Sequence, residues 1–258
     1  MMLQQTQASH VVSFYHQWLK NFPTFTVLAS ASTADVLRAW SGLGYNNRAL
    51  RIHQTAKQVV TKYRGRLPRD IETLQTLPGI GKYSSHAICC FAFHHTLPVV
   101  DVNIKRIYTR VSKRVKSAGE MVSEQKAWEI AEKILPAKSA YHWNQALMDL
   151  GALVCTARNP RCLQCPLQTF CKSASLPIFL TKEKKAKKNE PSYRGIPRRL
   201  YRGKILKLLH NHAFTGSEIA QLLWKNVKPR DVEWLHHVMG LMEKDGLIRL
   251  QKQTYRIA

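Results

Sequence analysis

Four cysteines between residues 155 and 171 constrain this chain more than any other feature of its sequence. Cys155, Cys162, Cys165 and Cys171 follow the spacing C-x6-C-x2-C-x5-C. In a reducing compartment, such a cluster binds a metal group more often than it forms disulfides. Four thiolates on a short irregular loop suit either a tetrahedral zinc ion or an iron–sulfur cluster, and the spacing alone leaves both open.

The other two cysteines, Cys89 and Cys90, are adjacent and lie in an apolar run. Neighbouring residues on a helix point about 100° apart, so these two side chains do not share one face. Cysteine without a partner behaves as a small buried hydrophobic residue. We therefore predict that both are packing residues and that neither belongs to the metal-binding loop.

The balance of charge indicates the class of partner. The chain has 40 Lys+Arg against 16 Asp+Glu, a formal net charge of +24, while 45% hydrophobic residues exclude a disordered protein. This excess favours nucleic acid as the partner, with a merely basic soluble surface as the alternative. No apolar run reaches the roughly 20 residues of a membrane helix, and no signal-peptide pattern begins the chain. We expect an intracellular protein, cytoplasmic or nucleoid-associated.

Hydrophobic periodicity divides the chain into three parts. Residues 1–175 show mostly helical spacing, 176–195 form a basic linker, and 196–258 form a second unit. In that unit we expect a helix over 200–211, a helix from a capping box at Thr215 to Trp224, a helix that begins near Pro229, and a hairpin. This order predicts a winged helix whose third helix recognises DNA. A protein-docking or dimerisation module of the same shape is the alternative.

Two further motifs carry chemistry that charge alone does not specify. In the run 77–82, Gly79 and Gly81 lie between two helical segments, so backbone N–H groups at a helix N-terminus can bind a phosphate, and Lys82 adds charge. Asp101 precedes an amphipathic helix, and the ordinary role of such an aspartate is to cap it. The positive end of a helix also keeps a carboxylate ionised, as the stabiliser of a developing cation must be.

Six motifs in order carry a resemblance over about the first 175 residues. They are Met2-Leu3-Gln4-Gln5-Thr6-Gln7, Trp40-Ser41-Gly42-Leu43-Gly44-Tyr45, Leu77-Pro78-Gly79-Ile80-Gly81, Asp101-Val102-Asn103, the run 144–152 (NQALMDLGA) and the four cysteines. Together they resemble the helix-hairpin-helix DNA glycosylases with an iron–sulfur cluster, and specifically MutY-type adenine DNA glycosylases. The cysteine spacing also occurs in endonuclease III, whereas Leu-Gln-Gln-Thr-Gln is similar to MutY.

The resemblance implies a fold and a set of site residues. The fold is mainly α, and Cys155, Cys162, Cys165 and Cys171 would hold a 4Fe–4S cluster. Asp101 would be the catalytic carboxylate with Tyr83 beside it, and the hairpin residues Gly79, Gly81 and Lys82 would grip the DNA backbone. Gln4 and Gln5 would enter the duplex near the extruded adenine, Tyr45 would lie near the opposite base, and Asp149 would contact the adenine. Asn103 belongs to the motif that carries Asp101 and is a further DNA-binding candidate.

The implied activity is hydrolysis of the N-glycosidic bond of adenine mispaired with 8-oxoguanine or guanine, by a monomer bound to double-stranded DNA. Adenine in a duplex must first be flipped into a pocket, and its bond then breaks with oxocarbenium character. Bifunctional relatives use a Lys where this chain has Tyr83, and Lys82 points about 100° away on a helix. We therefore expect a monofunctional glycosylase that leaves an abasic site uncut.

The chain departs from the MutY-type pattern in two places. The family's general acid is a Glu two residues before the Met that corresponds to Met2, which here falls just before Met1. We interpret this as a misassigned start codon or a fragmentary gene. Typical MutY-type proteins carry a larger Nudix-like domain that helps recognise 8-oxoguanine. This chain has a basic linker and residues 196–258 instead. Two alternatives remain. One is a thymine or uracil mismatch glycosylase, because relatives with that activity share the cluster, the hairpin and a Tyr like Tyr83. The other is a DNA-binding relative without catalysis, which the absence of the Glu supports.

Overall fold

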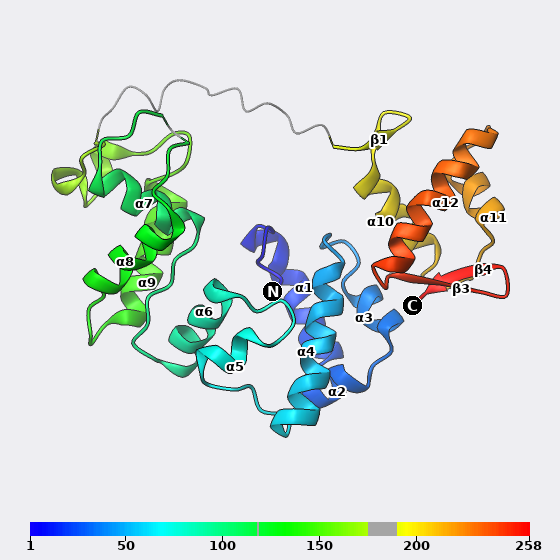
Figure 1. The fold of residues 1–258 in the computed structure, drawn as a ribbon, viewed down its shortest axis with the longest axis horizontal. Helices are drawn as coiled ribbons and strands as arrows, with labels where there is room; N and C mark the ends of the chain where they lie inside the picture. The colour runs from blue at the N-terminus through cyan, green and yellow to red at the C-terminus, as the bar shows by residue number, and fades with distance from the viewer. Residues whose placement is uncertain (118, 175–189) are drawn as a thin grey trace. The chain divides into compact units, whose positions relative to one another are not determined.

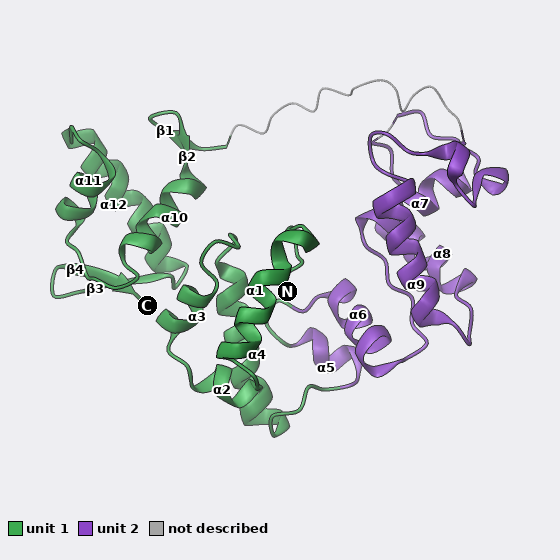
Figure 2. Ribbon diagram, turned by 180° about the vertical axis from the view of Figure 1, so that it is seen from behind, with its two compact units in different colours: residues 1–68, 77–79, 188–258 green, residues 69–76, 80–187 purple. Residues whose placement is uncertain are grey.

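The computed structural model describes residues 1–117, 119–174 and 190–258, and these are mainly helical, as predicted (Figure 1). The chain forms two compact units (Figure 2). Unit 1 comprises the described parts of residues 1–68, 77–79 and 188–258, and unit 2 those of 69–76 and 80–187. Most of the predicted linker, residues 176–189, lies outside the described residues, and the division at 175 and 196 stays a prediction.

Unit 1 contains two groups of helices from opposite ends of the chain. Those near the N-terminus are α1 (Ala8–Asn21), α2 (Phe25–Ser30), α3 (Thr33–Ala39) and α4 (Asn47–Tyr63). Those near the C-terminus are α10 (Arg198–Leu208), α11 (Gly216–Leu223) and α12 (Pro229–Lys244), with two small hairpins, β1 (Ser192–Tyr193) with β2 (Ile196–Pro197) and β3 (Ile248–Gln251) with β4 (Thr254–Ile257).

Local signals in the C-terminal module, residues 190–258, have the predicted effects. Thr215 and Glu218 form a capping box at the start of α11. Pro229 occupies the first turn of α12. Gly246 follows the helix at a φ of +71°, a left-handed conformation that suits glycine. Three helices followed by a hairpin therefore form in the order expected of a winged helix.

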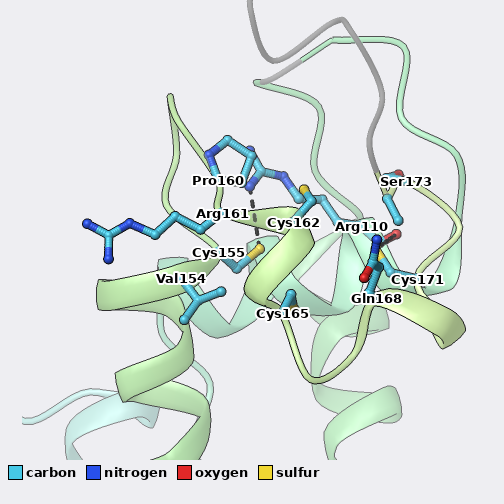
Figure 3. A pocket seen from close by; sticks show the side chains of 11 residues that line it. Arg110, Val154, Cys155, Pro160, Arg161, Cys162, Cys165, Gln168, Cys171 and Ser173 are labelled. Carbon is cyan, nitrogen blue, oxygen red and sulfur yellow. Dashed lines mark hydrogen bonds between the residues drawn. The ribbon is translucent and has the colours of Figure 1, made fainter.

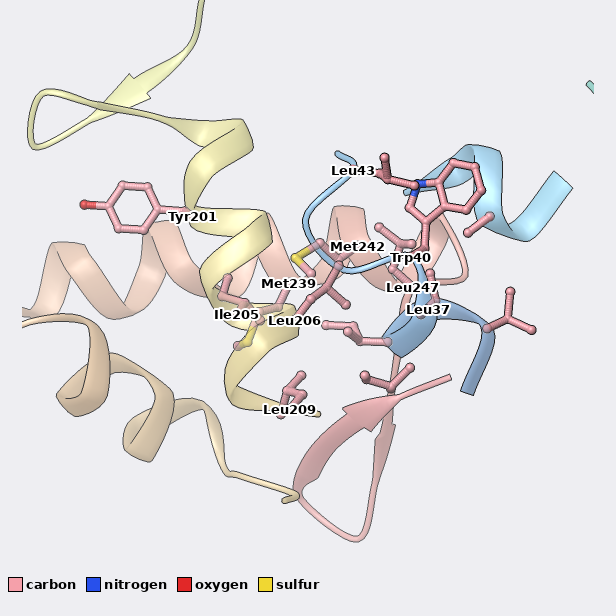
Figure 4. Packing of buried hydrophobic residues seen from close by; sticks show 14 of the residues in the cluster. Leu37, Trp40, Leu43, Tyr201, Ile205, Leu206, Leu209, Met239, Met242 and Leu247 are labelled. Carbon is pink, nitrogen blue, oxygen red and sulfur yellow. The ribbon is translucent and has the colours of Figure 1, made fainter. Parts of the chain in front are cut away.

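One hydrophobic core joins the two ends of the chain within unit 1. Trp40 at the C-cap of α3 is fully buried, and Leu37 of α3 packs in the same cluster as Leu206 of α10 and Leu209 at its C-cap (Figure 4). A hydrogen bond of 2.7 Å from Arg38 Nε to the carbonyl of His210 adds a polar contact. The C-terminal module therefore packs directly on α3 and shares its core.

Unit 2 contains α5 (Ile71–Gln75), α6 (Lys82–Phe93), α7 (Val102–Ser112), α8 (Glu124–Ile134) and α9 (Ala140–Asp149). A π-helical turn, η1 (Leu150–Val154), extends α9, and two 3-10 turns, η2 (Cys162–Gln164) and η3 (Gln168–Phe170), follow in the cysteine loop. Ile104, Ile107 and Tyr108 of α7 pack with Trp128 of α8. Cys89 and Cys90 are fully buried in α6, as predicted.

A buried asparagine fixes the segment that leads into α7. Asn144 of α9 is fully buried, and its Nδ2 donates to the carbonyls of Leu97 and Ala140 at 2.9 and 2.8 Å. Its Oδ1 accepts from Val99 N at 3.0 Å. The extended segment before Asp101 is therefore held by side-chain bonds, because it has no strand partner. Among the described residues, no helix is long and apolar enough to span a membrane.

A buried carboxylate anchors the first hairpin of the C-terminal module. Asp231 of α12 is fully buried and accepts hydrogen bonds from Tyr193 Oη at 2.5 Å, Arg194 Nη2 at 2.6 Å and Lys228 N at 2.7 Å. Tyr193 also stacks on Trp234 with ring centroids 4.4 Å apart. Burial alone raises the pKa of Asp231, but these donors outweigh it and hold the pKa at about 2.

We expect Asp231→Asn to lower the melting temperature by several degrees, because it leaves Arg194 without its buried partner. A carboxylate with a depressed pKa stabilises the fold above its unfolded pKa. That contribution is therefore lost as the pH falls from about 4 to about 2, and the variant should lose less stability over this range. Asp35→Asn, at a carboxylate 57% exposed, is the control. Equal melting temperatures for Asp231→Asn and Asp35→Asn would contradict this role.

Candidate active site

Asp101 is the N-cap of α7. Its Oδ1 accepts a hydrogen bond of 2.7 Å from Ile104 N, and its Oδ2 accepts one of 2.8 Å from Asn103 Nδ2. Both oxygens are thus oriented by N–H donors at the positive end of the helix. This geometry combines the ordinary capping role with a negative charge in a fixed position, as the sequence indicated.

A chain of hydrogen bonds runs from Asp101 to the cysteine loop. Asn103 Oδ1 accepts from Arg106 Nη1 at 2.9 Å. The buried guanidinium of Arg106 also donates from Nη2 to the carbonyl of Gly151 at 2.8 Å and from Nε to the carbonyl of Cys155 at 2.9 Å. Burial lowers the pKa of Arg106. Two side chains therefore connect the candidate catalytic carboxylate to the backbone of the first cysteine.

Close packing at Gly151 makes this connection possible. A Cβ at Gly151 would lie 2.9 Å from Cβ of Asn103 and 3.5 Å from Cδ1 of Ile107. The first distance is shorter than real Cβ contacts allow, so only glycine fits where η1 crosses α7. The close approach of η1 to α7 thus explains why the run 144–152 has a glycine at position 151.

The four cysteines line one pocket, together with Arg110 (Figure 3). Arg110 Nη1 donates to Cys155 Sγ at 3.4 Å and to the carbonyl of Thr156 at 2.7 Å. Cys171 Sγ donates to the carbonyl of Arg110 at 3.2 Å. Arg110 therefore supplies positive charge and fixed geometry to a set of four soft ligands.

The donor set fits a metal cluster. Burial raises the pKa of the Cys171 thiol, and the other three cysteines raise it further, so cationic iron would offset the cost of ionising four thiols together. Four cysteines around one pocket are compatible with an iron–sulfur group.

Tyr83 and Lys82 begin α6 and have different surroundings. Burial raises the pKa of Tyr83, and the negative charge of Asp101 raises it further. Lys82 Nζ lies 4.2 Å from the centroid of the Trp128 ring, a cation–π contact. Lys82 is thus held against α8, whereas the position of Tyr83 beside Asp101 stays a prediction.

The glycines of the hairpin take the conformations that the sequence suggested. Gly79 has a φ of +80°, and a Cβ there would lie 2.6 Å from Met1 Cε and 3.1 Å from Arg51 Cδ. Gly81 is the N-cap of α6 and has no side chain to occupy the helix N-terminus. The hairpin thus presents a helix N-terminus of the kind that binds phosphate.

Gln4, Gln5 and Tyr45 lie on two irregular segments of unit 1. Gln4 Nε2 donates to the carbonyl of Gly79 at 3.5 Å. Gln5 and Tyr45 have positive φ values of 59° and 49°, which are uncommon for residues other than glycine. The Tyr45 side chain is 62% exposed, so it is available to a partner.

Arg48 holds these two segments together. Its buried guanidinium donates to the carbonyls of Met1, Met2 and Gln4 on one segment, and to those of Leu43 and Gly44 on the other. It also lies 5.4 Å from the centroid of the Tyr45 ring. One side chain thus positions both the glutamines and the tyrosine that were predicted to enter the duplex.

The structure distributes the predicted residues between the units. Unit 1 has Gln4, Gln5, Tyr45 and Gly79, and unit 2 has Gly81, Lys82, Tyr83, Asp101, Asn103, Asp149 and the four cysteines. Asp149 ends α9 and is exposed, and no hydrogen bond or ion pair joins its side chain to another described residue. Its predicted contact with adenine stays a prediction.

Sequence reasoning missed three buried arginines, Arg48, Arg106 and Arg110. The last two are four residues apart, on the face of α7 that also buries Ile107. A cation at a core position of an amphipathic helix is the signal that could have indicated them. Arg48 also lies at a buried position of an amphipathic helix, α4, but no local pattern indicates that it bonds the carbonyls of Met1 and Met2.

We expect Arg48→Lys to destabilise the protein by about 2 kcal/mol or more, because an ammonium cannot replace a guanidinium with this many acceptors. Hydrogen exchange at residues 1–7 and 43–46 should become faster. The control is Arg51→Lys, one turn further along α4 and exposed. Unchanged exchange in both segments would show that Arg48 does not hold them.

Two models of known protein families match this chain. The model of the HhH-GPD superfamily of base excision DNA repair proteins matches residues 1–133, and that of the iron–sulfur binding domain of endonuclease III matches residues 155–171. The second match contains the four cysteines. It confirms the predicted cofactor of this loop, a 4Fe–4S cluster.

Comparisons with individual proteins also indicate a DNA glycosylase. The chain is 39% identical to an adenine DNA glycosylase of Mycolicibacterium smegmatis, over 91% of this chain and 74% of that protein. It is 45% identical to one of Mycobacterium tuberculosis, over 64% of this chain but only 55% of that protein. The solved structure of a thermostable thymine-DNA glycosylase superposes with a TM-score of 0.60 at 28% identity, covering 66% of this chain and 78% of that one. The chain therefore belongs to the HhH-GPD superfamily of base excision DNA repair proteins.

Proposed function

We propose that this protein is a monofunctional adenine DNA glycosylase that removes adenine mispaired with 8-oxoguanine or guanine. The observation that carries the proposal is Asp101, a carboxylate held by two N–H donors at the start of α7 and connected to the cysteine loop. The identity to adenine DNA glycosylases over most of the chain supports adenine as the base.

Asp101 would act on the sugar. Cleavage of the N-glycosidic bond gives the deoxyribose oxocarbenium character, and a fixed carboxylate stabilises that charge without reorganising. The donors Ile104 N and Asn103 Nδ2 keep the carboxylate oxygens in place, so little freedom has to be lost when the sugar binds. Cys155, Cys162, Cys165 and Cys171 would hold the 4Fe–4S cluster, which would fix the cysteine loop to whose backbone Arg106 ties Asn103.

The lysine beside Tyr83 does not support Schiff-base chemistry. A bifunctional glycosylase needs an amine that attacks the sugar carbon. Lys82 Nζ lies against the Trp128 ring, and the adjacent Tyr83, whose phenol pKa the charge of Asp101 raises, offers no amine. This arrangement supports simple hydrolysis, which leaves an abasic site.

The remaining predicted residues would hold the duplex. Gly79, Gly81 and Lys82 would contact the DNA backbone, Gln4 and Gln5 would enter near the flipped adenine, and Tyr45 would lie beside the opposite base. The exposure of Tyr45 and the clamping of its segment by Arg48 support a wedge held in place before DNA binds. Residues 1–175 would form the glycosylase domain, and 196–258 a DNA-binding module after the linker. We further propose that the protein acts as a monomer inside the cell, on chromosomal DNA.

A thymine or uracil mismatch glycosylase is the second candidate. The likeness to the solved thymine-DNA glycosylase favours it, as does the tyrosine at position 83. Single-turnover excision on duplexes containing A·8-oxoguanine, A·G, T·G and U·G distinguishes the two. Release of adenine only would support the proposal, and release of thymine or uracil would replace it. Tight binding without any release would indicate a non-catalytic relative.

We expect Asp101→Asn to lower the single-turnover rate of adenine release by about 10²–10³-fold, because the amide keeps an oxygen for the cap but loses the charge. Asp70 is a matched control, because it caps α5 through the same contact, from Thr73 N at 2.7 Å. Asp70→Asn should leave the rate unchanged. Equal rates for the wild type and Asp101→Asn would remove Asp101 from the mechanism.

We expect Arg106→Lys to slow adenine release by about 10²-fold with little change in DNA affinity, since Asn103 and Asp101 lose their fixed geometry. The absorbance of the bound cluster reports whether the cysteine loop is intact. Arg114→Lys, at an exposed position nearby, is the control. A loss of DNA affinity equal to the loss of rate would argue that Arg106 supports binding and not positioning.

A further inference from the structure

A groove of about 950 Å³ lies in unit 1, between the Tyr45 segment and α10. Its lining includes Gln5, Tyr45 and Arg51 on one side and Arg198, Arg199 and Arg202 on the other. The N-terminal part of the chain and the C-terminal module thus form its two walls. None of the catalytic residues proposed above lines it.

The helix that borders the groove has an unusual charge. Five Lys and Arg residues lie in α10, at positions 198, 199, 202, 204 and 207, and it contains no Asp or Glu. The predicted recognition helix, α12, has two cations, Arg230 and Lys244, against three acidic residues, Asp231, Glu233 and Glu243. Phosphate binding requires positive potential, so the charge favours α10 as the helix that meets DNA.

Two cations on opposite walls have no partner in the described part of the chain. Neither Arg51 nor Arg198 has a side-chain hydrogen bond or ion pair there, whereas Arg199 pairs with Glu190 and Arg202 with Asp245. The Arg199 side chain is 64% exposed, so its surface pair contributes little and can exchange for a phosphate. The groove therefore offers several guanidinium groups to an anionic chain.

The residues next to the groove indicate which anionic chain would bind in it. Arg51 lies against Gly79 of the hairpin, since a Cβ there would be 3.1 Å from Arg51 Cδ. Tyr45 lines the groove and was assigned to the base opposite the adenine. A strand that runs past Tyr45 would therefore have its phosphates between Arg51 and α10.

The wall formed by α10 is fixed in place. Leu206 of α10 and Leu209 at its C-cap pack in the core with Leu37 of α3 (Figure 4). Arg38 also donates to the carbonyl of His210. A rigid wall loses little conformational freedom on binding, which favours a defined contact with the backbone over a loose electrostatic one.

We propose that this groove binds the sugar-phosphate backbone of the strand that carries the base opposite the target adenine. The C-terminal module then contacts DNA through α10, and α12 supports it from inside the core. The naming of the strand rests on the proposed adenine glycosylase activity, whereas the binding of duplex phosphates does not.

The test is the salt dependence of binding to a duplex of 30 base pairs with a central A·8-oxoguanine pair. Each phosphate contact adds about 0.9 to the slope of log K against log salt, so Arg198→Ala with Arg199→Ala should lower the slope by about 1.8. Between 50 and 200 mM salt, the affinity would then fall roughly tenfold less than for the wild type.

Two double variants are the controls. Arg249→Ala with Arg256→Ala removes two exposed charges that face each other across β3 and β4, and Arg230→Ala with Lys244→Ala removes the two cations of α12. Both should keep the wild-type slope. A larger change in either control than in the α10 variant would overturn the proposal, as would an unchanged slope in the α10 variant. Equal melting temperatures exclude misfolding as the cause.

Neutral methylphosphonates identify the strand. Placed in the strand opposite the adenine, they should abolish the difference in slope between the wild type and the α10 variant, and placed in the adenine strand they should leave it. The reverse result would overturn the strand assignment. If the α10 variant changes the slope but the wild type releases no adenine, the proposed function fails and the phosphate groove stands. Adenine release with an unchanged slope refutes the groove alone.

Discussion

The guanidinium group of Arg106 joins the part of unit 2 that carries the candidate catalytic carboxylate to the part that carries the cluster. Its three nitrogens donate to Asn103, Gly151 and Cys155 from a buried position. Burying a cation is costly unless each donor finds an acceptor, so the geometry of α7, η1 and the loop must be satisfied together. Asp101 is consequently oriented by a loop that begins more than fifty residues later in the chain.

In unit 1, the buried guanidinium of Arg48 likewise holds separate segments of the chain together. Arg48 donates to carbonyls of the segment around Gln4 and of the segment around Gly44, neither of which belongs to a regular helix. Irregular backbone needs hydrogen-bond partners when it is buried, and a planar group with five donors can serve several carbonyls at once. Both units thus fix irregular segments near candidate functional residues with buried arginines, Arg48 in unit 1 and Arg106 with Arg110 in unit 2.

In the C-terminal module, one helix supplies many of the core residues and another carries most of the helical cations. Its third helix supplies the core residues Leu235, Met239 and Met242 and the buried anchor Asp231, whereas its first helix has only cations among its charged residues. The order of elements predicted a winged helix, and that order is present. The distribution of charge, however, favours the first helix as the face for a polyanion.

The sequence by itself determined the helical class, the caps at Asp101 and Thr215, the buried pair Cys89 and Cys90, and the cysteine ligands, because these depend on short-range spacing. It also indicated Tyr83 beside Asp101, through a resemblance rather than through geometry. Only the tertiary structure decided the roles of Arg48 and Arg106, the steric need for Gly151, and the groove between Tyr45 and α10. Each of these depends on contacts between residues distant in the chain, and no local pattern of residues specifies which distant carbonyl or helix a side chain will meet.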